Sequence, residues 1–232
     1  MDWTRPHGPD THGASPAHPF AGSTRVDVAV AGVASLRLAV AAAAGAHVLV
    51  IDGALAPVGE DWLWEAIGIL DLLPQVACVG GRVAGQDGTI LAGELLFEPG
   101  GRVSSPLAGR SILDPGPYAY SLKPHLTDAV SGRFFVARRA WLEAALASLP
   151  AVAGLGNLGA WLGACALEDG CAVAWSPLFA AAAPSGWTGE ERPGLPETDA
   201  LGVRLPAGSL GRAGWRRRWA ELAEGRFLPP PG

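Results

Sequence analysis

The stretch VLVIDGA at residues 48–54 decides the fold class of this chain. Its first four residues, 48–51, are apolar and typical of a buried strand, and Asp52 follows them directly. In an open α/β sheet, ligands bind in the crevice outside the carboxyl ends of the strands, so this pattern directs the Asp52 carboxylate into the crevice. The same pattern is equally typical of a buried strand that ends in a tight turn, with Asp52 and Gly53 as the turn residues.

On both sides of this stretch, apolar residues follow the periodicity of helices and of short strands in alternation. Helices are expected at 34–44, 62–73, 139–149 and 158–167, and strands at 26–30, 48–51, 76–79, 129–137 and 171–175. Asp87 and Gly88 separate two β-prone stretches within 82–97, which indicates a hairpin. The loop-rich segment 100–124 is long enough to form one wall of a binding site. This order predicts an α/β fold with a mixed, mostly parallel sheet and helices on both faces.

Composition divides the chain into three regions. Residues 1–24 are rich in Pro, Gly and His and predict a disordered arm, whose histidines we expect to be solvated rather than bound to metal. Residues 25–187 carry the periodic pattern and predict one α/β domain, since 232 residues can bury one substantial core. Residues 188–232 predict an irregular Pro- and Gly-rich tail with a short basic amphipathic helix at 215–224.

Charge and cysteine content limit the partners and the compartment. The net charge of −5 argues against a basic surface for nucleic acid. The three cysteines are an odd number without zinc spacing, which is typical of a reducing cytoplasm. The apolar stretch 28–51 contains charged and glycine residues and predicts a helix followed by a strand rather than a transmembrane segment. With no secretory signal apparent, we expect a cytoplasmic protein whose only membrane contact would be peripheral, at the inner membrane.

The order and spacing of several motifs resemble those of family 2 glycosyltransferases, from about residue 26 to residue 227. The motifs are the strand into Asp52, EDWL at 60–63, GGRV at 80–83, DGTI at 87–90, SG at 131–132, FFV at 134–136, RR at 138–139, GCAVAWSP at 170–177, and Trp219, Leu222 and Phe227. The resemblance implies a GT-A type fold, shortened at its amino end. It also implies transfer of a sugar from a nucleotide-sugar donor in bacterial glycan or envelope synthesis, with Asp52 binding the donor and a divalent metal, Mn²⁺ or Mg²⁺.

The chain departs from the family pattern at two places where chemistry is needed. Ala54 stands where the family has a second acidic residue, and LGAW at 158–161 stands where it has an acidic cluster on a late helix. A single carboxylate makes a weak site for a hard cation. Inverting sugar transfer also needs a carboxylate that accepts the proton of the attacking hydroxyl group. We therefore predict a glycosyltransferase-like pseudoenzyme of weak or no activity, in which no catalytic residue is assigned.

Two further residues are candidates for the acceptor side of the site, and two other classes of function are alternatives to sugar transfer. His125, in a polar loop, and Trp161, in the altered late helix, are the acceptor-side candidates. A different class of function is a non-catalytic subunit that binds a glycan or serves as a scaffold for a complete partner glycosyltransferase. Because GLGNLG at 154–159 matches the GxGxxG fingerprint, a dinucleotide-binding protein is the third hypothesis. Too few residues precede this motif for a strand, and Ser176 and Pro177 stand where an acidic residue should meet the ribose, so we interpret it as a loop and a helix start.

Overall fold

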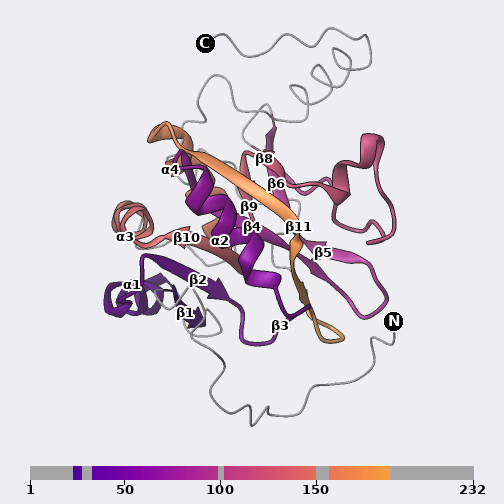
Figure 1. Ribbon diagram of the computed structural model, residues 1–232, viewed down its shortest axis with the longest axis horizontal. Helices are drawn as coiled ribbons and strands as arrows, with labels where there is room; N and C mark the ends of the chain where they lie inside the picture. The colour runs from indigo at the N-terminus through magenta and orange to yellow at the C-terminus, as the bar shows by residue number, and fades with distance from the viewer. Residues whose placement is uncertain (1–22, 28–32, 99–101, 150–156, 189–232) are drawn as a thin grey trace, which may run out of the picture.

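The computed structural model describes residues 23–27, 33–98, 102–149 and 157–188 (Figure 1). The predicted arm up to residue 22 and the predicted tail from residue 189, with its helix at 215–224, lie outside the described residues. So do Gly154 and Gly156 of the GxGxxG motif. β1 (Ser23–Asp27) begins three residues before the strand expected at 26–30.

The larger sheet is mixed, as predicted. Within the described ranges it has eight strands, six of them in the order β1, β2 (His47–Ile51), β10 (Phe134–Arg138), β4 (Val76–Ala84), β11 (Ala172–Ala182) and β3 (Ala56–Pro57). Two more strands, β5 (Ile90–Ala92) and β8 (His125–Thr127), pair with β4 and β11. β1 pairs in parallel with β2, and β4 with β11, whereas β10 runs antiparallel between β2 and β4. Antiparallel pairing therefore has a larger share than the sequence pattern predicted.

A second, antiparallel sheet contains β7 (Arg102–Ser104), β6 (Glu94–Glu98) and β9 (Ala129–Val130) in that order. The strand expected at 129–137 is thus two strands, because residues 131–133 separate β9 in the small sheet from β10 in the large one. The segment expected as a loop at 100–124 contains β7 and the 3₁₀ helix η1 (Pro117–Leu122). The hairpin expected at Asp87 and Gly88 is confirmed, since β4 and β5 pair antiparallel across it.

Helices cover both faces of the large sheet, as predicted. They are α1 (Val33–Ala42), α2 (Trp62–Leu72), α3 (Arg139–Ser148) and α4 (Leu158–Glu168). Successive residues of a strand point to opposite faces, and β2 follows this rule. Val48 and Val50 pack in one core cluster with residues of α1, α3 and α4, whereas Leu49 and Ile51 pack in another with residues of α2. Figure 1 shows α2 lying in front of the sheet.

β11 continues to Ala182, well beyond the strand end expected at 175. Pro177 has no N–H group for a strand ladder, and the register between β11 and β4 shifts between Ser176 and Ala180. The proline therefore lies in an irregularity of the strand rather than at its end.

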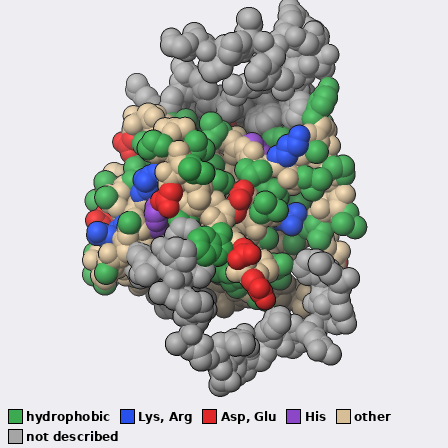
Figure 2. All heavy atoms as spheres, viewed as in Figure 1, with side chains coloured by type: hydrophobic (Ala, Val, Ile, Leu, Met, Phe, Trp, Pro, Cys, Tyr) green, Lys and Arg blue, Asp and Glu red, His purple; other side chains and the backbone are tan. Residues whose placement is uncertain are grey.

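The surface carries charges of both signs. On the face drawn in Figure 2, the Lys and Arg side chains are spread among acidic and apolar ones. Among the helices that the structure describes, none is long and apolar enough to cross a membrane.

Candidate functional site

Asp52 lies directly after β2, and both of its carboxylate oxygens accept hydrogen bonds from the protein. Oδ1 accepts the backbone N–H of Ala54, at 3.0 Å. Oδ2 accepts Nη1 of Arg133, at 2.9 Å, and the indole Nε1 of Trp187, at 3.4 Å. Asp52 is only 7% exposed, so these groups replace most of the water around its carboxylate.

The pairing of β2 with β10 holds Arg133 against Asp52. The backbone N–H of Asp52 donates to the carbonyl oxygen of Arg133 at 2.8 Å, which continues the antiparallel ladder by one residue beyond Ile51 and Phe134. Residues directly opposite each other in such a ladder have side chains on the same face. The Arg133 guanidinium group is therefore placed beside the carboxylate by backbone geometry, and the side chains form an ion pair of 2.9 Å.

The surroundings of Asp52 favour its charged form. Burial alone would raise the pKa of this carboxyl group, but the Ala54 N–H, the Arg133 guanidinium group and the Trp187 indole together outweigh burial and lower the pKa. The carboxylate is thus ionised at neutral pH, and a protein cation already balances its charge.

Asp52→Asn should lower the free energy of unfolding at pH 7 by about 1–3 kcal/mol, because it removes a charged acceptor from Arg133. The folded pKa lies below the unfolded value, so the carboxylate stabilises the fold above the unfolded pKa, near 3.8, and this contribution is lost as the pH falls through the folded pKa. The difference between wild type and variant should therefore shrink below about pH 4. Urea denaturation of both proteins from pH 7 to pH 3 measures it, and a difference that does not change with pH would contradict this account.

The residues around Asp52 do not fit a divalent cation. A hard cation needs several oxygen ligands, and here the second family position is Ala54, which has no oxygen in its side chain. A cation on Asp52 would also have to displace Arg133 from Oδ2. Across the described part of the chain, no group of three or more His, Cys, Asp or Glu side chains is arranged to hold a metal ion. The role of Asp52 as a donor-binding residue stays a prediction.

The first turn of α4 lies against the 130–132 segment, next to Arg133. Leu158, Gly159 and Ala160 are buried, and the position of a Cβ on Gly132 would be 2.8 Å from the amide nitrogen of Gly159. Trp161 is partly buried and packs against two core clusters, as predicted for a side chain that contacts the core. Within the described part of the chain, its buried indole nitrogen has no hydrogen-bond partner. Its acceptor-side role stays a prediction.

His125 belongs to a second polar cluster, around the buried carboxylate of Glu94. It lies at the start of β8 rather than in the polar loop that we expected. Glu94 is fully buried, and its Oε2 accepts the phenolic O–H of Tyr120 and lies 2.8 Å from Nε2 of His125. The imidazole ring stacks on the ring of Tyr120, with 4.0 Å between ring centroids. Burial, and next the charge of Glu94, raise the pKa of Tyr120, so its phenol stays protonated and donates.

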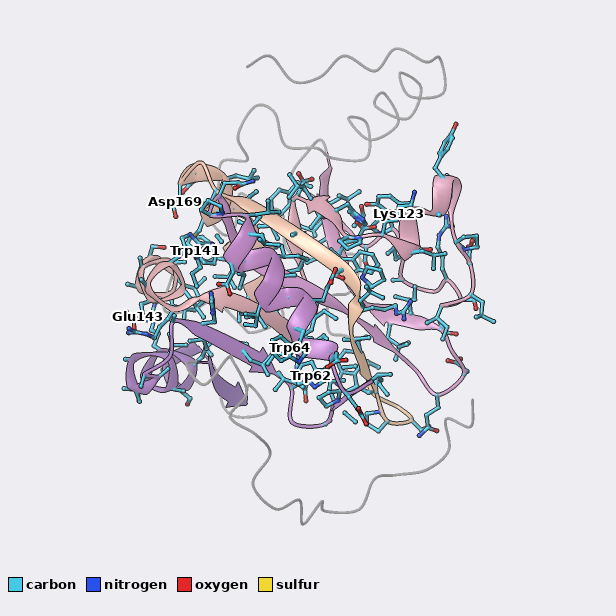
Figure 3. The ribbon with its side chains drawn as sticks, in the orientation of Figure 1. Trp62, Trp64, Lys123, Trp141, Glu143 and Asp169 are labelled. Atoms are coloured by element: carbon cyan, nitrogen blue, oxygen red, sulfur yellow. The ribbon has the colours of Figure 1, made fainter. Side chains whose placement is uncertain are left out.

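The two clusters lie in different parts of the sheet. The strand order places β10, β4 and β11 between β2 and β8. At about 4.8 Å per strand, His125 is about 19 Å from Asp52 across the sheet. Figure 3 agrees, since Lys123, two residues before His125, lies well away from Trp62, which stacks on Phe134 next to Arg133.

Sequence reasoning missed Arg133, Trp187 and Glu94 as members of these clusters. A signal for Arg133 was present, because Arg133 precedes the apolar run 134–137 just as Asp52 follows the apolar run 48–51. If these two runs are antiparallel neighbours, the arginine and the aspartate lie side by side. Glu94 precedes Leu95, Leu96 and Phe97 and shows no pattern that would reveal a buried carboxylate.

Comparison with solved structures finds chains of distant structural likeness. No family model and no curated protein matches this chain. Among solved structures, a crystal structure of GalNAc-T7 with UDP, GalNAc and Mn²⁺ matches with a TM-score of 0.45 at 10% sequence identity. The match covers 68% of this chain and 30% of that chain, so this chain spans less than a third of the length of that protein. The fold described above rests on the strand ladders of this chain and not on this likeness.

Proposed function

We propose that this chain is a glycosyltransferase-like protein of bacterial glycan or envelope synthesis that binds a nucleotide sugar at the carboxyl end of β2. It is a weak or inactive transferase that does not use a divalent cation. The observation that carries the proposal is the ion pair of Asp52 with Arg133, supported by the Trp187 indole. In metal-assisted transfer a cation on the carboxylate offsets the charge of the leaving diphosphate. In this chain a guanidinium group already occupies that place on the carboxylate.

The start of α4 supports the second part of the proposal, low activity. The LGAW run at 158–161 offers no group that accepts a proton, and its first three residues are buried. A positioned base contributes about 10²–10⁴-fold to the rate of such a reaction. A nucleotide sugar bound beside Asp52 would therefore react slowly even with an acceptor in place.

A panel of nucleoside-diphosphate sugars, tested by thermal shift and calorimetric titration, tests the proposal. We expect at least one of them to raise the melting temperature to the same extent with Mn²⁺ and with EDTA, and to release no nucleoside diphosphate above background. Asp114→Asn, which changes an exposed acidic residue, is the matched control for Asp52→Asn.

Three outcomes would overturn the proposal. The first is binding that requires Mn²⁺ and is lost in Asp52→Asn but not in Asp114→Asn. The second is clear turnover of any nucleotide sugar. The third is binding of a free glycan without binding of any nucleotide sugar, which would favour the non-catalytic glycan-binding subunit.

A further inference from the structure

Three charged residues lie in one row across three neighbouring strands. Asp52 and Arg133 are opposite each other at the end of the ladder between β2 and β10. The ladder between β10 and β4 pairs Phe135 with Gly80, and the position of a Cβ on Gly81 would be 2.4 Å from the ring of Phe134. One further step of this antiparallel ladder sets Arg133 opposite Arg82. The row is therefore Asp52, Arg133 and Arg82.

Arg82 extends from β4 toward the side of the large sheet where the small sheet lies. The position of a Cβ on Gly80 would be 2.3 Å from Cβ of Val130 in β9, so Gly80 faces the small sheet. Residues two apart in a strand share a face, so Arg82 faces the same way as Gly80. Arg82 is also near the carboxyl end of β4, which runs in the same direction as β2 because both are antiparallel to β10. It thus lies at the same edge of the sheet as Asp52.

The three side chains of this row carry two positive charges and one negative charge. The charge of Arg133 is matched by Asp52, at 2.9 Å. Arg82 is half-buried, and among the residues that the structure describes, no acidic side chain pairs with its guanidinium group. Burial lowers the pKa of Arg82, which reflects the cost of keeping this charge away from water. A guanidinium group in such a place is suited to an anionic ligand.

We propose that Arg82, with Arg133 beside it, binds the diphosphate of a nucleotide and supplies the positive charge that a divalent cation would otherwise provide. The inference rests on the proposed function, because it names the groups that hold the donor. The planar fork of a guanidinium group matches two phosphate oxygens at once. The crevice outside the carboxyl ends of β2 and β4 is where an open α/β sheet binds its ligand. Arg82 is then a binding residue and Asp52 a positioning residue that orients Arg133.

Calorimetric titration of the full chain in EDTA, with pyrophosphate, UDP and inorganic phosphate as probes, tests the site. Wild type should bind pyrophosphate and UDP more tightly than inorganic phosphate. Arg82→Gln should weaken pyrophosphate and UDP binding at least about tenfold, the size expected for losing a charge-assisted hydrogen bond, and Arg82→Lys should retain part of the affinity. Arg110→Gln, which removes an exposed arginine that pairs with Asp114 four residues away, should bind as wild type does. The melting temperature of Arg82→Gln should not fall, so the loss of binding would not reflect unfolding.

The outcomes separate this site from the proposed function. If UDP binds in EDTA but Arg82→Gln binds it equally well, the arginine site is wrong and the proposed function stands. If pyrophosphate binding depends on Arg82 while no nucleotide sugar binds, the anion site stands and the proposed function is wrong. If wild type binds none of the probes in EDTA, or equal losses occur in Arg82→Gln and Arg110→Gln, the site is overturned.

Discussion

Gly159→Ala should lower the free energy of unfolding by about 3 kcal/mol or more, measured by urea denaturation at pH 7. A Cβ at this position would lie 2.0 Å from the carbonyl oxygen of Val130 and 2.7 Å from the amide nitrogen of Gly132. Both contacts are with the backbone, so a change of side-chain rotamer cannot relieve them. The helix α4 has to move away from β9, and its buried first turn then loses its packing.

Gly68→Ala is the matched control for this variant. Gly68 also lies inside a helix, α2, but a Cβ there would meet no atom within 4 Å. Alanine at this position should raise stability by about 0.5–1 kcal/mol, because glycine loses more backbone freedom on folding. Equal stability of the two variants would contradict the close packing of α4 against β9. This close packing also accounts for the last glycine of the GxGxxG motif, so that glycine does not need a dinucleotide ligand to explain it.

His125→Ala should lower the free energy of unfolding by about 3–5 kcal/mol, the usual loss when one partner of a buried pair is removed. Nδ1 of His125 lies 2.9 Å from the carbonyl oxygen of Lys123, and a carbonyl oxygen only accepts, so the Nδ1 proton is directed there. Nε2 of the same ring lies 2.8 Å from Oε2 of Glu94. Removing the imidazole takes one of the groups that satisfy a fully buried carboxyl group.

Two companion variants show whether Glu94 is the cause of this loss. Tyr120→Phe removes the other donor to Oε2 with little change in volume and should cost about 1–3 kcal/mol. The double variant Glu94→Met/His125→Ala should recover part of the stability lost in His125→Ala, since it no longer buries a carboxylate at position 94 without its imidazole partner. Urea denaturation at pH 7 measures all three. A loss below about 1 kcal/mol in His125→Ala, or no recovery in the double variant, would contradict the account.

The helices and the hairpin could be predicted because local features set their limits. Pro74 follows the predicted helix 62–73, and α2 ends at Leu72. The position of Gly45 likewise predicted the end of the first helix, and α1 ends at Ala42. The turn residues at 87–88 predicted the hairpin because their backbone preference needs no distant partner. The alternating order of these elements was then enough to predict a mixed sheet with helices on both faces.

The candidate site could be predicted only in part, because its contacts join residues far apart in the sequence. Asp52 and Arg133 are 81 residues apart, and Glu94 and His125 are 31 apart. Periodicity does not tell which strands are neighbours, so the antiparallel insertion of β10 was not foreseen. Without that pairing, Asp52 looked like a carboxylate open to a metal. With it, Asp52 is one end of a row of charges.

The short segment between β9 and β10 connects the small sheet to the large one. Residues 129–138 form one short piece of chain that serves both sheets, and the amide of Ser131 donates to the carbonyl oxygen of Gly93 at 2.8 Å, next to Glu94. Arg133, two residues later, contacts Asp52. Moving the small sheet therefore shifts the guanidinium group that faces the crevice, and a ligand that fixes this group resists that movement. We therefore expect local opening at Glu94 and at Asp52 to be coupled, so that amide hydrogens in both places exchange at similar rates.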